Sequence, residues 1–254
     1  MPIPGQPPPS PELRLALRLF AEHRTTEAGD VVTAAARAAK ADAGSGSHPL
    51  ALAYADLARF HYHAGDFKKA AGEFKHACDN PLPADPAGRR DRLAFMFGVA
   101  ASLDALGRPA DAEKVYRRCV AFARSLHGPA APGTAAAIEP LAAFLLRVGN
   151  YAEAAALAGE ACDIFRAHGD PAVAAVTPTR AEATRRAVLA HLGRDGPAEL
   201  VARLEVAFED GGTVHLVPHL ARDPDPAEAA RLESLLTRAV DELYARKPDP
   251  SPDP

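Results

Sequence analysis

Four glycines recur through the middle of the chain at a nearly constant interval. Gly65, Gly107, Gly149 and Gly193 are spaced 42, 42 and 44 residues apart. Around the first three the sequence reads "LARFHYHAGDFKKAAGEFKHAC", "VAASLDALGRPADAEKVYRRC" and "LAAFLLRVGNYAEAAALAGEAC". A fixed interval that carries the same kinds of residue at the same positions is the signature of a repeat array, in which each unit stacks on the next.

Side chains of defined size flank each glycine at fixed distances. A small residue lies seven positions before it and five after it, and a larger slot lies nine after it: Ala58, Ala100, Ala142; Ala70, Ala112, Ala154; Phe74, Tyr116, Ala158. A glycine that ends one helix, followed by Asp66 or Asn150 as the N-cap of another, predicts a helical hairpin. We expect the alanines to face each other inside the hairpin and the aromatic residue to pack toward the neighbouring repeat.

The composition agrees with a helical chain and narrows the functions. Hydrophobic residues make up 48% of the 254 residues but aromatic residues only 6%, so much of the apolar content is alanine, the best helix former. A net charge of −4 gives no reason to expect binding of nucleic acid, which depends on a concentrated basic surface. Neither a signal peptide nor an apolar run long enough to span a membrane is found, and three widely separated cysteines fit a reducing compartment, so we expect a cytoplasmic protein.

The spacing resembles the tetratricopeptide repeat. The family's small residue on the first helix, its turn glycine, and its alanine, aromatic residue and second alanine on the second helix are matched in order by Ala58, Gly65, Ala70, Phe74 and Ala77. The 42-residue period is similar to the longer repeats of kinesin light chains and of many bacterial members. The resemblance implies an all-α fold: a right-handed superhelical solenoid of antiparallel helix pairs, with about four to five hairpins and a C-terminal capping helix.

The expected domain organisation follows from the repeat frame. Residues 10–246 form a single repeat domain between a Pro-rich disordered N-terminus at 1–9 and a disordered Pro/Asp tail at 247–254. Within it we expect a degenerate hairpin at 10–44, repeats at 48–80, 91–127, 134–168 and 177–208, and a capping helix at 226–246. Arg186 replaces the alanine of the other repeats, which predicts a looser fourth hairpin. Residues 209–226 are interpreted as a long loop.

Residues that often carry chemistry are present but badly placed for it. His61 and His63 are two apart and point in different directions on a helix, while His215 and His219 are four apart but flank Pro218 in the expected loop. The cysteines, which fall late in second helices, are interpreted as small buried hydrophobes: Cys78, Cys119 and Cys162. The sequence therefore predicts no enzyme, catalytic residue, metal ligand or cofactor. A metal-dependent activity using His215 and His219 is the least favoured alternative.

The resemblance implies that the first helices of the repeats line a concave groove that binds a partner. Positions counted from each glycine give the candidate partner-binding residues Arg59, Tyr62, His63, Phe97, Asp104, Glu139, Leu146, Arg147, Arg180 and His191. The groove positions that clamp a terminal carboxylate in chaperone-binding members carry non-matching residues here. We therefore expect a non-catalytic scaffold or adaptor that binds an unidentified protein or peptide, without nucleic acid or membrane. The alternative is a structural module that self-assembles, for example as a homodimer, through repeat ends or the C-terminal helix.

Overall fold

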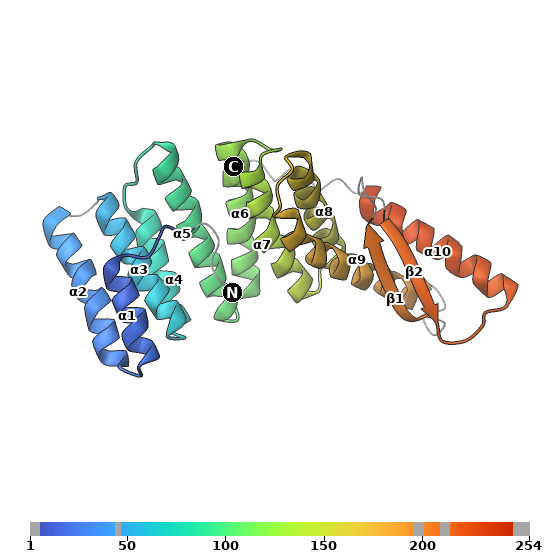
Figure 1. Cartoon of the computed structure of the whole chain (residues 1–254), viewed down its shortest axis with the longest axis horizontal. Coiled ribbons are helices and arrows are strands. Elements are labelled where there is room, and N and C mark those ends of the chain that lie inside the picture. Colours follow the sequence, from blue (N-terminus) through green and yellow to red (C-terminus); the bar gives the residue numbers. More distant parts are fainter. Residues whose placement is uncertain (1–5, 44–46, 196–200, 209–213, 246–254) are drawn as a thin grey trace. The chain divides into compact units, whose positions relative to one another are not determined.

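The computed structural model describes residues 6–43, 47–195, 201–208 and 214–245, and these residues form ten helices and one two-stranded sheet (Figure 1). Most of the helices pack against their neighbours in the chain, which confirms the all-α class of the repeat architecture. The chain divides into two compact units, Met1–Leu126 and His127–Pro254, called unit 1 and unit 2 below.

Unit 1 consists of helical hairpins in sequence. Its helices are α1 (Pro11–Ala21), α2 (Thr25–Ala43), α3 (His48–His63), α4 (Phe67–Asp79), α5 (Pro86–Ala105) and α6 (Pro109–His127), the last of which ends at the unit boundary. Each of α1 to α4 packs against the helix that follows it. In addition, α1 contacts α3 and α3 contacts α5, so the first helices of successive hairpins lie side by side in one layer.

Unit 2 adds a sheet to its helices. Its elements are α7 (Pro132–Val148), α8 (Tyr151–Ala167), α9 (Val173–Asp195), β1 (Val201–Phe208), β2 (Val214–Leu220) and α10 (Pro226–Ala245). The helices α7, α8 and α9 pack in order, β1 pairs antiparallel with β2, and α10 packs on α9. Val188 of α9, Leu204 of β1 and Leu236 of α10 are buried in one apolar cluster. This cluster joins the β1–β2 sheet and α10 to α9.

The first three turn glycines have the backbone that the repeat pattern requires. Gly65, Gly107 and Gly149 have φ angles of +79°, +76° and +91°, a left-handed conformation that a side chain would strain. After Gly65, the carboxylate of Asp66 accepts the Lys69 N–H at 3.2 Å and caps α4. The stretch "HYHAGDFKKAAGEF" is thus a turn between two helices, as the sequence predicts.

The small-residue positions are buried as expected. Ala58, Ala70, Ala100 and Ala112 are fully buried, as are the equivalent alanines of the third repeat. At Phe74 the aromatic slot behaves as predicted, because its ring on α4 packs directly against Gly98 on α5, in the neighbouring repeat. Tyr116, in the same slot of α6, contacts Phe97 of its own hairpin. Small residues inside each hairpin and an aromatic residue between hairpins therefore set the spacing of the helices.

The fourth repeat departs from the sequence-based expectation. Gly193 lies inside α9, which continues to Asp195, and residues 201–208, expected in a second helix, form β1. Part of the expected loop, Val214–Leu220, forms β2. The physical reason is a change of period: apolar residues alternate at Leu204, Val206 and Phe208, which suits the two faces of a strand rather than a helix.

The C-terminal helix is found near its expected place, with α10 covering Pro226–Ala245. The expected disordered tail at 247–254 lies outside the described residues.

Candidate partner-binding site

A stretch of the N-terminus lies extended on the layer of first helices (Figure 1). Arg59 Nη1 on α3 donates to the Pro7 carbonyl at 2.9 Å, and the Ser10 N–H donates to Asp56 Oδ2 on the same helix at 3.2 Å. Gln6 Nε2 donates to the Ala94 carbonyl of α5 at 2.7 Å. We call Gln6–Ser10 the strap, and Asp56, Arg59 and Ala94 the α3–α5 face. Residues 6–9, part of the Pro-rich N-terminus expected to be extended or disordered, lie here in an extended conformation.

The strap is extended because of its prolines. Pro7, Pro8 and Pro9 each fix their own φ, and every residue that precedes a proline is pushed toward extended backbone. Ser10, which precedes Pro11, has φ −60° and ψ 163°, close to polyproline II geometry. Its hydroxyl then accepts the Leu13 N–H at 3.1 Å and caps α1, so that the strap ends where the first helix begins.

An ion pair holds the main chain of the strap. Arg59 Nη1 lies 3.3 Å from Asp56 Oδ1, and the two side chains are only 17% and 13% exposed. Burial lowers the pKa of Arg59 from its ordinary value, and the charge of Asp56 opposes that shift. Because a partly buried ion pair needs further hydrogen bonds to satisfy its charges, the Pro7 carbonyl and the Ser10 N–H stabilise it. The pair thus presents one donor and one acceptor to an extended chain.

Three more candidate residues lie near this pair. The Tyr62 ring packs against Phe67 at 5.3 Å between centroids, and burial together with the charge of Asp104 raises the pKa of Tyr62. His63 is exposed, and partial desolvation and the charge of Arg59 lower its pKa. Electrostatic interactions thus link His63 with Arg59 on α3 and Tyr62 on α3 with Asp104 on α5, and these four residues stay candidates for partner contact.

Phe97, in contrast, belongs to the hydrophobic core. Its side chain is 3% exposed, and its ring centroid lies 6.3 Å from that of Tyr116 on α6. The residue therefore holds its own hairpin together and offers no surface to a partner.

The candidate residues of unit 2 fall into two groups. Glu139, Leu146 and Arg147 lie on α7; burial raises the pKa of Glu139, and Arg147 lies over the Phe144 ring at 5.3 Å. They stay candidates for partner contact.

The second group comes from α9. Arg180 is 3% exposed, and its guanidinium carbon lies 4.2 Å from the centre of the Phe208 ring of β1. This cation–π contact makes Arg180 a structural link between α9 and the sheet. His191 also lies on α9, but its side chain is outside the described residues.

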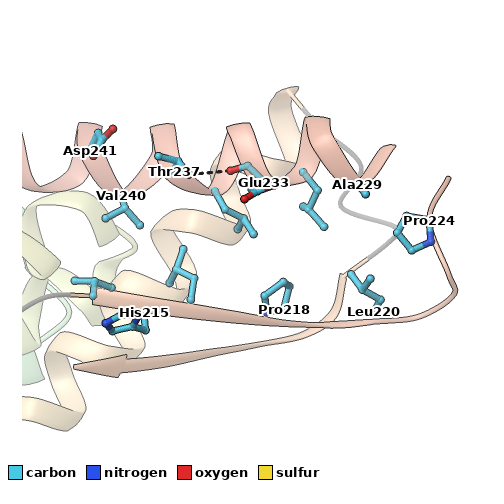
Figure 2. Close-up of a pocket in the computed structure, with 13 residues that line it drawn as sticks. His215, Pro218, Leu220, Pro224, Ala229, Glu233, Thr237, Val240 and Asp241 are labelled. Carbon is cyan, nitrogen blue, oxygen red and sulfur yellow. Dashed lines mark hydrogen bonds between the residues drawn. The ribbon is translucent and has the colours of Figure 1, made fainter. Parts of the chain in front are cut away.

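Sequence reasoning did not find a groove between β2 and α10. Its volume is about 470 Å³, and Figure 2 shows Pro218 and Leu220 of β2 along its strand side and Val240 of α10 opposite His215 at one end. Leu220, 39% exposed, and the carboxylates of Glu233 and Asp241 also line the groove. The alternating apolar residues of β2 were the signal that would have placed a strand here.

The same strand separates the two histidines of the proposed metal pair. His215 and His219 both lie on β2, and four strand residues span about 13 Å, too far for both side chains to bind one ion. His219 Nε2 instead lies 3.3 Å from Glu205 Oε1 on β1. Among the described residues, no group of three or more His, Cys, Asp or Glu side chains could hold a metal.

The three cysteines have the environment of core residues. Cys119 and Cys162 are buried and Cys78 is partly buried, and all three are free thiols. Burial raises the pKa of Cys78 to about 11 and also raises that of Cys119 and Cys162. Since the thiolate is the reactive form, these residues are poor nucleophiles at neutral pH.

The family model and a solved structure with a TM-score above 0.5 agree with the helical-repeat fold. Residues 92–167 match the family model of the tetratricopeptide repeat. A search of curated proteins finds no match. A crystal structure of nearly identical TPR-like repeats assigned to a kinesin light chain of Podosopora anserina superposes with a TM-score of 0.55 at 16% identity, covering 92% of this chain and 96% of that one. BtubC (BKLC) from P. vanneervenii superposes with a TM-score of 0.45 at 15% identity, covering 96% and 95%. None of the described helices has the length and apolar character needed to cross a bilayer.

Proposed function

We propose that this chain, a tetratricopeptide repeat protein, is a non-catalytic scaffold that binds an extended segment of a partner protein on its α3–α5 face. Proteins of this fold serve as interaction scaffolds, in which stacked hairpins present one helix layer as a binding surface.

One observation favours the α3–α5 face as the binding surface. The strap already lies there, and Asp56 and Arg59 hold it through its main chain rather than through its side chains. A surface that holds the backbone of one extended segment can hold another, because main-chain groups are shared by all peptides. Tyr62, His63 and Asp104 continue the same face beyond the strap contacts.

A catalytic role is not part of the proposal. The thiols of Cys78, Cys119 and Cys162 have raised pKa values, and His215 and His219 are too far apart to share a metal ion. The free thiols also support a reducing location, and we propose the cytoplasm.

Self-assembly through α10 receives less support than the scaffold. Leu232 and Leu236, the apolar residues of α10 through which a second copy could pair, are buried in unit 2 against α9 and β1. Placing charges on these residues would unfold unit 2 instead of testing an interface.

The test is an affinity capture from host lysate with the full chain and two charge-reversal variants. Arg59→Glu removes the side-chain donor that the face offers to a main-chain carbonyl, so this variant should lose the partner. Arg18→Glu, on an exposed position of α1, should retain it. Circular dichroism first establishes that both variants stay helical. A partner captured equally by both variants would place the binding surface elsewhere in the molecule.

A further inference from the structure

We infer that the α3–α5 face recognises proline-rich segments in the polyproline II conformation, and that the strap is its built-in, displaceable occupant. The inference rests on the proposed scaffold function and names the class of partner segment that the face accepts.

The spacing of the strap contacts fits polyproline II. Arg59 holds the carbonyl of Pro7, and Asp56 holds the N–H of Ser10, three residues later. Three residues make one turn of a polyproline II helix, so the ion pair holds the main chain once at each end of a single turn.

The residues between the two contacts explain why proline is favoured. Pro8 and Pro9 have no N–H, so the strap brings no donor between Pro7 and Ser10 that a partly buried face would have to satisfy. Proline also fixes the extended conformation before binding, which lowers the entropy lost on contact. A flexible segment of the same length would lose more conformational freedom for the same two hydrogen bonds.

The strap is held, but imperfectly. Within the described part of the chain, Gln6 Oε1 is buried without a hydrogen-bond donor, although its amide nitrogen reaches Ala94. A buried acceptor without a donor costs free energy. A segment of a partner protein that avoids this penalty, or that also contacts Tyr62 and Asp104, would therefore replace the strap.

The covalent link between the strap and α1 determines how strongly the strap competes with a free peptide. A short covalent linker gives a bound segment an effective concentration on the order of millimolar, so a free peptide must overcome an occupant that is always present. The free peptide therefore binds the intact chain more weakly than it binds a chain whose strap has been loosened.

The experiment measures binding of a fluorescein-labelled peptide, GQPPPSPE, to the full-length protein by fluorescence anisotropy. The peptide repeats residues 5–12 of the chain. In the strap variant, Pro8→Gly with Pro9→Gly, we expect roughly tenfold tighter binding than in the wild type, because the loosened strap competes less well. Adding Arg59→Met to the strap variant should weaken binding at least about tenfold, whereas adding Arg18→Met should not.

A control peptide, GQGGGSGE, tests whether proline matters, and it should bind at least roughly tenfold more weakly than GQPPPSPE. In the wild type, saturating GQPPPSPE should also speed hydrogen exchange at the Ser10 amide, since this N–H loses Asp56 when the strap leaves. This second measurement uses the wild type alone, so its result does not depend on whether a variant folds.

Each contrary result overturns a distinct part of the inference. Equal affinity in the wild type and the strap variant, or an unchanged Ser10 amide, overturns the strap as a displaceable occupant. Equal affinity for the two peptides overturns recognition of polyproline II, and binding that survives Arg59→Met moves the site. If no form binds GQPPPSPE while lysate capture still depends on Arg59, the scaffold proposal stands and the proline-rich partner class is wrong.

Discussion

Gly98 of α5 has room for only a hydrogen atom opposite the buried ring of Phe74. A Cβ built there would lie 2.5 Å from Phe74 Cδ1, closer than nonbonded carbons come in folded proteins. Replacing glycine by alanine inside a helix normally stabilises it by about 1 kcal/mol. Because the ring is fully buried and cannot move aside freely, overpacking should outweigh this gain, and we expect Gly98→Ala to destabilise the protein by about 1–2 kcal/mol.

Gly72 of α4 supplies the matched control. It lies in a helix as Gly98 does, but a Cβ there meets no other atom within 4 Å. Gly72→Ala should therefore stabilise by up to about 1 kcal/mol. Urea unfolding of both variants measures the difference, and stabilisation of the same size at the two sites would show that Phe74 does not set the helix spacing.

Single residues also show how far sequence reasoning reached into the site. The repeat frame proposed Arg59, Tyr62 and Asp104 as candidates, because a turn glycine fixes which side of the preceding helix faces the first-helix layer. It also proposed Phe97 as a surface residue. The ring instead packs against Tyr116 of its own hairpin, because a residue at the margin of a helix face can turn toward the neighbouring helix. The repeat frame missed Asp56, whose role depends on a contact with Ser10, 46 residues earlier in the chain.

At the scale of elements, α10 begins with a reciprocal capping arrangement. Asp225 Oδ1 accepts the Glu228 N–H at 2.8 Å, and Glu228 Oε2 accepts the Asp225 N–H at 3.1 Å, with Pro226 at the first helical position. Arg222 donates to both carboxylate oxygens of Glu228, at 2.9 and 2.7 Å. These bonds join the segment after β2 to the start of the helix.

The charge of Glu228 should make the start of α10 sensitive to acid. Hydrogen bonds from Arg222 and from the Asp225 N–H lower the pKa of Glu228 to about 2, below its value of 4.5 in an unfolded chain. A lowered pKa contributes stability above pH 4.5 that is lost as the pH falls toward 2. We expect the α10 N-terminus to fray over this range, measured in an acid titration as a fall in the amide protection factors, each taken relative to the intrinsic exchange rate at the same pH. Glu228→Gln keeps an acceptor for the Asp225 N–H but has no charge, so its α10 should lack this pH dependence.

The sheet of unit 2 was the element that sequence reasoning missed. Three helical hairpins, each centred on a turn glycine, led us to predict a fourth around Gly193, which lies at nearly the same spacing. After Gly193, however, the apolar residues no longer recur at helical spacing and alternate instead, with Leu216, Pro218 and Leu220 on one side of β2. A repeat spacing predicts where a unit should begin, but the local period decides which element forms there.

At the scale of the whole molecule, the sequence predicted the helical-repeat fold better than the contacts of the N-terminal strap. Helices and turns follow from local residue types at a fixed interval, so the hairpins of unit 1 could be placed before any contact was known. The strap depends on a meeting between the N-terminus and two later helices. Its proline content predicts its extended backbone but not the surface on which it lies.

The last prediction concerns the stability of the native state in the presence of a ligand. A ligand that binds only the native state stabilises it by RT ln(1 + [L]/Kd), which is about 2.7 kcal/mol at one hundred times Kd. At a GQPPPSPE concentration that meets this condition for the strap variant, the wild type, with roughly tenfold weaker binding, should gain only about 1.4 kcal/mol.

Urea unfolding with and without peptide measures each gain within one protein, so that the lower starting stability of the strap variant cancels. Arg59→Met in the strap variant should reduce the gain, because the guanidinium that donates to the carbonyl of the bound segment is gone. Equal gains in the wild type and the strap variant would mean that the peptide and the strap do not compete. The hydrogen bonds of Asp56 and Arg59 to Ser10 and Pro7 would then serve only to anchor the start of α1.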